Sequence, residues 1–288
     1  MKKWLEESVR WHMLCMKSEI IKKIGIFALV GYSFVIILLA CLGPIRYHEI
    51  DTNILPVISI QHRGSYTINA NDLETVIADF PELSSYIISF DEPRLIEVSS
   101  GEWIPFYFPI YPLICIPVKI VLEFLKLDPQ RTFFITNALL LCGALFFLQL
   151  RLQVSYIQRL IAVLLLAITP IIYYINYLNY EVFIYSMLII AFVLWYNKNR
   201  NWSAFFVSIA AMPNSTVAAI GIAMIIEYLI GIILKKGKKS IVELVRIYWK
   251  KTIIYALCFV PCIIPFIVQY YYLRGNVFSS TASSDGLF

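Results

Sequence analysis

Long uninterrupted apolar runs constrain this chain more than any other feature of its sequence. The first run, Gly25–Leu42, directly follows a pair of lysines. A run of about 18 or more apolar residues matches the thickness of the bilayer core and predicts a spanning helix. Further apolar runs occupy residues 106–125, 132–150, 160–175, 182–196, 203–234 and 252–273. Together they predict an all-α polytopic membrane protein with about seven membrane segments, one pair of them forming a helical hairpin.

The composition and the placement of charge agree with a bilayer as the main partner. Only 15% of the residues are charged and 60% are hydrophobic, whereas a soluble domain carries about 25% charged residues. The net charge of +5 arises from lysines and arginines in short loops between apolar runs, which is typical of cytoplasmic loops. A nucleic-acid-binding protein would instead need a basic face with interleaved aromatic residues, so we predict no nucleic-acid partner.

The charge distribution also predicts an orientation in the cell membrane. Residues 1–23 carry six lysines and arginines and are therefore predicted to be cytoplasmic, with the first helix kept as a signal anchor. Twelve of the 19 acidic residues fall within residues 43–131, which are predicted to lie outside. The predicted protein is multi-pass, with its N-terminus in the cytoplasm.

The run at residues 106–125 is predicted to lie in the membrane interface. If it crossed, the basic loops after the next spans would be placed outside, against the positive-inside preference. Three prolines, each of which removes a backbone donor, interrupt the run: Pro109, Pro112 and Pro117. A polar stripe follows at helical spacing: Lys119, Glu123 and Lys126. These features predict an interfacial helix at residues 106–126, and a tilted span is the alternative.

The run at residues 203–234 is too long for one crossing and has basic residues at both ends. Pro213-Asn214-Ser215-Thr216 supplies a turn about a third of the way along, so we predict a helical hairpin with at least one short arm. The predicted organisation is a cytoplasmic N-terminus (1–23), a first span (24–42), an external cap that contains the interfacial helix (43–130), a helical bundle (131–273) and an external tail (274–288).

The external cap is predicted to be a small folded unit of mixed structure. Residues 57–60 and 65–68 have strand-like composition, with Gly64 as a turn between them. Asn71 is a plausible helix N-cap with Glu74 as its capping-box partner, and the helix should end near Phe80.

Three groups of ionisable residues are candidates for chemistry. Asp91, Glu92 and Arg94 place two carboxylates beside a guanidinium, which could provide a base and a phosphate ligand; ordinary turn chemistry is the alternative. Glu181 follows a tyrosine-rich segment, and an interfacial aromatic belt explains the tyrosines but not the acid. Glu227 is an acid within an apolar run, either functional or paired with a nearby lysine.

The order of these parts resembles the N-terminal half of GT-C type membrane glycosyltransferases, the class of protein O-mannosyltransferases and lipid-A aminoarabinose transferases. A first span is followed by an acidic external loop and then by a Tyr/Pro-rich segment at residues 106–113. The next similar pieces are the span at 131–150, the stretch from Thr169-Pro170 to Asn179-Tyr180-Glu181, the hairpin at 203–218 and the segment 271–276. The resemblance covers roughly residues 24–280.

The resemblance implies transfer of a sugar from a polyprenyl-phosphate carrier to a glycan, lipid or protein acceptor on the outer face. The base for the acceptor hydroxyl would be Asp91 or Glu92, with Glu181 as a second acid and Arg94 or Arg63 facing the carrier phosphate. The family's acidic pair lies closer to the first span, so Asp51 or Asp72 could hold the role instead. Asn214 stands where relatives often carry an Arg-Pro turn, and the chain has fewer membrane segments than relatives usually have.

Two other functions stay open at this stage. A non-catalytic envelope or assembly protein would have acids scattered over the cap and no cavity. A transporter is disfavoured because the spans contain few ionisable residues and no visible repeat. Nothing in the sequence demands a metal or another cofactor beyond the lipid-linked sugar, which would be the donor substrate.

Overall fold

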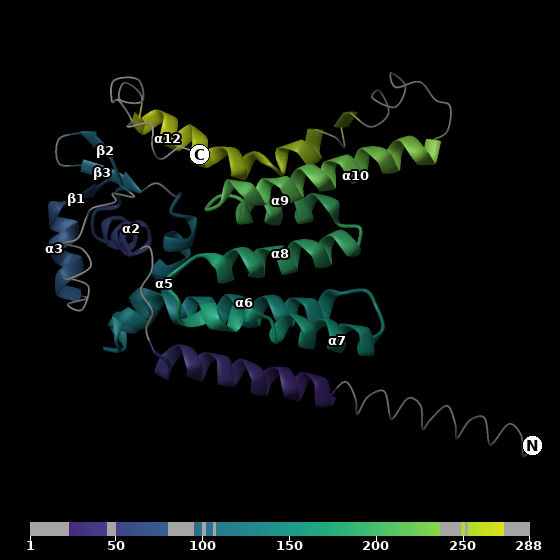
Figure 1. Cartoon of the computed structure of the whole chain (residues 1–288), viewed down its shortest axis with the longest axis horizontal. Helices are drawn as coiled ribbons and strands as arrows, with labels where there is room; N and C mark the ends of the chain where they lie inside the picture. The colour runs from purple at the N-terminus through teal and green to yellow at the C-terminus, as the bar shows by residue number, and fades with distance from the viewer. Residues whose placement is uncertain are drawn as a thin grey trace, which may run out of the picture.

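The computed structural model shows a bundle of helices with a small mixed cap at one end (Figure 1). It describes residues 23–44, 50–79, 95–99, 102–105, 108–236, 249–250 and 253–273. The described part of the bundle consists of a first helix (Lys23–Leu42), α6 (Thr132–Arg151), α7 (Tyr156–Ala167), α8 (Glu181–Tyr196), α9 (Arg200–Ala210), α10 (Ala218–Lys236) and α12 (Ile264–Leu273), with short 3-10 segments η2 (Pro129–Arg131), η3 (Pro170–Asn176), η4 (Ser215–Val217) and η5 (Val260–Ile263).

The cap contains three helices and a three-stranded antiparallel sheet. Its elements are α2 (Ile50–Arg63), β1 (Ile68–Asn69), α3 (Ala70–Asp79), β2 (Leu95–Ser99), β3 (Glu102–Pro105) and α5 (Ile110–Phe124). The strand order is β1-β3-β2, with Ile68 opposite Trp103 and Ile96 opposite Ile104. The predicted mixed cap between the first helix and α6 is therefore present among the described residues.

The helices of the bundle lie roughly side by side, and their connections alternate between two ends (Figure 1). The cap covers one end, which we call the cap end, and η3 and the start of α8 lie there. The α6–α7 and α8–α9 connections and the end of α10 lie at the opposite end, on the right of the view. We call this the basic end because it carries Arg151, Arg159, Lys198 and Arg200.

The prediction of about seven membrane segments is wrong. Within the described ranges, two helices are long and apolar enough to cross a membrane. They are Lys23–Leu42 and Pro129–Arg151, the second of which consists of η2 and α6. A third crossing is reached only if α7 and η3, which meet at a bend of 54°, are counted as one broken span. Two described helices could therefore cross a bilayer, which is consistent with association with a membrane.

The other apolar runs fall short of a span because they are broken into shorter helices. α8 has 16 residues and is about 24 Å long at 1.5 Å per residue, whereas the bilayer core is about 30 Å thick. The run at 252–273 is interrupted by η5, which has Pro261 at its start. Apolar length along the sequence therefore overestimates helix length wherever a proline or a 3-10 turn redirects the chain.

The predicted hairpin at residues 203–234 is present as α9 and α10. The turn is at the predicted position, where the Asn214 side chain accepts a hydrogen bond from the Thr216 backbone amide at 3.1 Å and opens η4. α9 has only 11 residues, which agrees with the predicted short arm.

Two details of the predicted cap are wrong. Residues 57–60 are helical and belong to α2, because Ile54, Leu55 and Ile58 recur at helical spacing and are all buried. Helix α3 is capped by Asn69 and not by Asn71: the Asn69 side chain accepts from the Asp72 amide at 3.1 Å, and Asp72 accepts from the Asn69 amide at 2.9 Å. This reciprocal pair is a capping box two residues earlier than predicted.

The first helix packs alongside α7 and η3 in the same direction. The Tyr32 hydroxyl donates to the Ala167 carbonyl at 2.8 Å, and the Asn176 amide donates to the Leu39 carbonyl at 3.1 Å. Near the end of this contact, a Cβ on Gly43 would overlap the Asn176 amide, so only glycine permits the approach.

Helix α5 differs from the predicted interfacial helix in what its polar stripe contacts. Lys119 is only 1% exposed, and its ammonium group pairs with Asp79 of α3 at 3.4 Å and with Glu123 one turn along α5. Gln61 of α2 donates to Glu123 at 2.8 Å. Lys126 lies beyond the helix, at a φ of 56°. The stripe therefore faces the rest of the cap, where it binds α2 and α3 to α5.

The Lys119 cluster predicts that two sets of substitutions lower the free energy of unfolding by different amounts. Asp79→Asn combined with Glu123→Gln leaves a buried ammonium without an anion and should cost about 3–5 kcal/mol. Lys119→Met leaves two carboxylates that water can reach and should cost about half of that or less. Thermal unfolding of the detergent-solubilised variants measures both, and an equal loss in the two would contradict this account.

Candidate functional site

Arg63 and Asp72, two of the predicted site residues, form an ion pair inside the cap. The guanidinium contacts the carboxylate twice, with Nη2–Oδ2 at 2.5 Å and Nε–Oδ1 at 3.1 Å. Arg63 also donates to the Thr67 carbonyl and to the Ser59 hydroxyl. The hydrogen bond to Asp72 raises the pKa of the Arg63 guanidinium. Asp72 is 3% exposed, and this geometry suits joining α2 to α3 better than accepting a proton from a substrate.

Glu123 is a second cap carboxylate that pairs with a basic side chain. Burial acts to raise the pKa of Glu123, but the hydrogen bonds from Lys119 and Gln61 outweigh it and hold the pKa below its usual value. The carboxylate is therefore ionised at neutral pH. Because the pKa is lowered in the folded state, the stabilisation from this pair is present above the ordinary glutamate pKa and is lost as the pH falls through the lowered one.

Asp51 lies in the first turn of α2, shortly after the end of the first helix. It is thus the described candidate acid nearest in sequence to the first span. Asp91, Glu92 and Arg94 lie outside the described residues, so their roles stay predictions.

Glu181 is the first residue of α8 and is partly buried at the cap end of the bundle. A helix N-terminus favours a negative charge because its free amide groups and the helix dipole both point toward it. Burial is the main cause that raises the pKa of the Tyr111 hydroxyl, and Glu181 makes a smaller contribution in the same direction. Tyr111 also packs against Phe183 at a ring separation of 6.2 Å. The start of α5 and the start of α8 therefore meet at this point.

A buried polar network continues from Tyr111 into the bundle. Its hydroxyl donates to the Asn137 side-chain oxygen at 2.8 Å, and both residues are fully buried. The Asn137 amide donates to three carbonyls near η3: Tyr174 at 3.4 Å, Ile175 at 3.3 Å and Tyr177 at 3.2 Å. These carbonyls lie where the helix breaks. Two of them also accept from backbone amides, Tyr174 from Tyr177 at 3.1 Å and Tyr177 from Asn179 at 2.9 Å, so Asn137 adds a side-chain donor to this turn.

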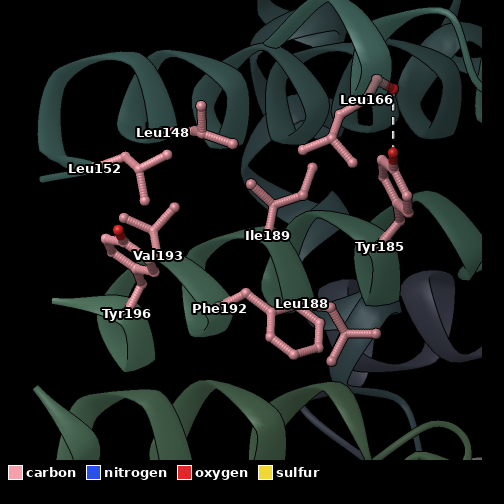
Figure 2. A pocket seen from close by; sticks show the side chains of 9 residues that line it. All are labelled: Leu148, Leu152, Leu166, Tyr185, Leu188, Ile189, Phe192, Val193 and Tyr196. Atoms are coloured by element: carbon pink, nitrogen blue, oxygen red, sulfur yellow. Dashed lines mark hydrogen bonds between the residues drawn. The ribbon is translucent and has the colours of Figure 1, made fainter. Parts of the chain in front are cut away.

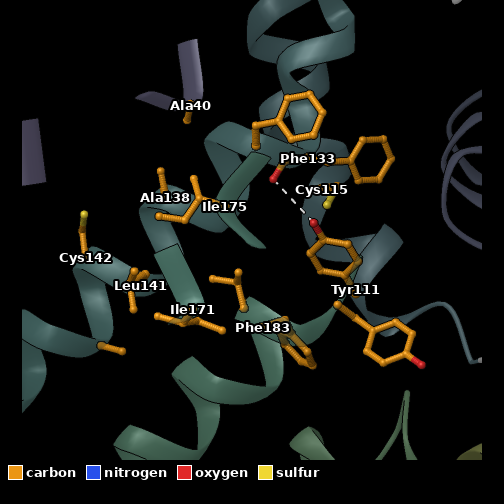
Figure 3. Packing of buried hydrophobic residues seen from close by; sticks show 14 of the residues in the cluster. Ala40, Tyr111, Cys115, Phe133, Ala138, Leu141, Cys142, Ile171, Ile175 and Phe183 are labelled. Carbon is orange, nitrogen blue, oxygen red and sulfur yellow. Dashed lines mark hydrogen bonds between the residues drawn. The ribbon is translucent and has the colours of Figure 1, made fainter. Parts of the chain in front are cut away.

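An apolar shell encloses this network. Figure 3 shows Tyr111 beside Cys115 and Phe133, with Phe183 on the α8 side. Burial raises the pKa of Tyr111 well above its usual value, so the hydroxyl stays protonated and remains a donor to Asn137. Ile54 of α2 belongs to the same buried cluster as Tyr111 and Phe183. The same cluster includes Leu148 and Val193 near the basic end, so it extends through the whole bundle. The Asp51 and Glu181 positions lie at the cap end because α2 and the start of α8 lie there (Figure 1).

Reasoning from sequence did not assign roles to Tyr111, Asn137 and Lys119 in these networks. Asn137 could have been singled out as a lone amide within an apolar run, since such a group must find a partner.

Glu227 pairs with Arg200 at 3.2 Å, and the Arg200 guanidinium also lies over the rings of Trp195 and Tyr228. The acid thus pairs with a basic residue, as the alternative interpretation proposed, but with an arginine in place of a lysine.

No protein-family model, curated protein or solved structure matches this chain.

The buried network predicts that removing one hydroxyl weakens the fold. Tyr111→Phe deletes the donor to Asn137 without changing the ring packing. It should lower the free energy of unfolding by about 1–3 kcal/mol, because a buried acceptor loses its partner. Tyr196→Phe, at an exposed ring, is the matched control and should change the melting temperature little. Equal melting temperatures for Tyr111→Phe and the wild type would refute the network.

Proposed function

We propose that this chain is a membrane-bound glycosyltransferase of the GT-C kind that acts on a polyprenyl-phosphate sugar at the cap end of the bundle. The observation that carries the proposal is that α2, α5 and the start of α8 all lie at the cap end of the molecule (Figure 1). Two of the predicted site acids, Asp51 in the first turn of α2 and Glu181 at the first residue of α8, belong to these elements, which supports a site at the cap end.

In the proposed reaction, Asp51 takes the proton of the acceptor hydroxyl. The hydroxyl oxygen then attacks the anomeric carbon of the sugar, and the bond from that carbon to the phosphate oxygen breaks. Polyprenyl phosphate leaves with the electron pair of that bond, and the configuration of the sugar inverts. Glu181 orients the sugar or the acceptor through hydrogen bonds. Because the Arg63 guanidinium is occupied by Asp72, Arg94 is the remaining arginine predicted to face the phosphate.

We further propose that the N-terminus is cytoplasmic and that the chain crosses the membrane more than once. The first helix and α6 are the proposed spans, with the bent α7–η3 pair as a third. The gathering of Arg151, Arg159, Lys198 and Arg200 at the basic end supports a cytoplasmic location for that end. The cap and Glu181 then share the external side.

A non-catalytic envelope or assembly protein is the second candidate, and one observation favours it. Asp72, Asp79 and Glu123 all engage basic side chains within the cap. Each of these three acids therefore has a basic partner inside the cap. Such pairing favours a stabilising role for them over a role in chemistry.

Donor turnover distinguishes the two candidates. The protein in lipid nanodiscs is incubated with polyprenyl-phosphate sugars in buffer, where water serves as the acceptor of the sugar, and release of polyprenyl phosphate is measured. Asp51→Asn and Glu181→Gln should each lower turnover by about 100-fold or more, the range expected for a positioned acid or base. Glu227→Gln, at an exposed acid far along α10, is the control and should retain activity. A wild-type protein that turns over none of these donors would favour the non-catalytic candidate.

The orientation is tested separately by cysteine accessibility. In a background without native cysteines, single cysteines at Glu74 and Asp128 should react with a membrane-impermeant maleimide added to intact cells. A cysteine at Lys198 should react only after the membrane is opened. Labelling of all three positions from the outside would refute the proposed topology.

A further inference from the structure

An apolar groove lies between α6, α7 and α8, away from the buried network. Its cavity has a volume of about 400 Å³ and is half open to the surface. It is lined almost wholly by aliphatic and aromatic side chains: Leu148, Leu152, Leu166, Tyr185, Leu188, Ile189, Phe192, Val193 and Tyr196. Figure 2 shows these side chains in a row that runs from Leu152 and Tyr196 to Leu166 and Tyr185.

The polar atoms at the far end of the groove are already satisfied. The Tyr185 hydroxyl donates to the Leu166 carbonyl at 3.1 Å and accepts from the Thr169 hydroxyl at 3.2 Å. This end therefore offers no free donor to a polar ligand. An occupant of the groove must be apolar along its length.

The length of the groove matches one leaflet of a bilayer. Tyr185 and Tyr196 mark its ends on α8, and their separation along the helix is about 16 Å at 1.5 Å per residue. The hydrocarbon core of a bilayer is about 30 Å thick, so one leaflet is about 15 Å. A single extended acyl chain therefore spans the groove from end to end.

Positive charge lies at the other end of the groove. The Asn197 amide donates to the Arg151 carbonyl at 2.6 Å, and its oxygen accepts from the Gln153 amide at 3.0 Å. This bridge closes the groove beside Leu152 and Tyr196. Arg151 and Lys198 lie on either side of the bridge, and both are exposed. Neither forms an ion pair with an acid in the part of the chain that the structure describes.

We propose that this groove binds one acyl chain of an anionic glycerophospholipid, with the lipid phosphate at Arg151 and Lys198. The groove is bordered by α6 and by the bent α7–η3 pair, which are candidate spans, so its open side faces the hydrocarbon of the membrane. The lipid belongs to the leaflet at the basic end. Its chain fills space that would otherwise leave the facing helices without packing partners. The proposal is independent of any transferase activity.

A photoactivatable phosphatidylglycerol with a diazirine in its acyl chain tests this site in nanodiscs. Mass spectrometry of the labelled full-length protein should place most of the label on peptides covering residues 145–153 and 185–197. Leu188→Trp, which fills the groove, should remove most of this label. Leu165→Trp, at an exposed position of α7 that does not line the groove, should leave the label in place.

The headgroup contact has its own test in the same assay. Arg151→Gln with Lys198→Gln should lower labelling by phosphatidylglycerol about fivefold for each charge removed, because each basic residue near an anionic lipid contributes roughly 1 kcal/mol. Labelling by a phosphatidylcholine probe with the same chain should change little, and Lys126→Gln is the control for loss of charge. Label spread evenly over all lipid-facing helices would overturn the proposal, as would equal labelling by the two probes. If Leu188→Trp does not fold, competition replaces it. Excess unlabelled phosphatidylglycerol should displace the label from the groove, and a label that is not displaced would overturn the proposal.

Discussion

The arrangement of the bundle depends on satisfying the backbone where the chain stops being helical at η3. Carbonyl groups of this segment lie next to α6, where backbone amides and the Asn137 side chain donate to them. Asn137 donates to three of them and accepts from Tyr111, so one amide joins α5, α6 and η3. Because Tyr111 is the second residue of α5, this network also ties the cap to the bundle.

The cap is stabilised by charge pairs that face inward. Arg63 and Asp72 join α2 to α3, and Lys119 joins α5 to both of them through Asp79, Glu123 and Gln61. These pairs hold the three helices of the cap together as one unit. They also reduce the number of acids available for chemistry, so the proposed function rests on the Asp51 and Glu181 positions.

Much of the chain's organisation could be predicted from its sequence, and the failures have physical causes. The first candidate span, the mixed cap and the hairpin turn at Asn214 follow from apolar length, charge and turn chemistry. The number of spans was overestimated because apolar residues also fill short helices that pack on one another. The polar stripe of α5 was assigned to the interface because a sequence does not show that Lys119 meets Asp79, a residue far away in the chain. The predicted site residues Asp91, Glu92 and Arg94 stay predictions.

The most direct test of this account is amide hydrogen exchange in nanodiscs, comparing the wild type with Asn137→Leu. If Asn137 supports the broken segment and the cap together, the substitution should speed exchange both in residues 170–177 and in α5, while α10 keeps its protection. Unchanged exchange in residues 170–177, or a change confined to α6 itself, would contradict the central role of this amide.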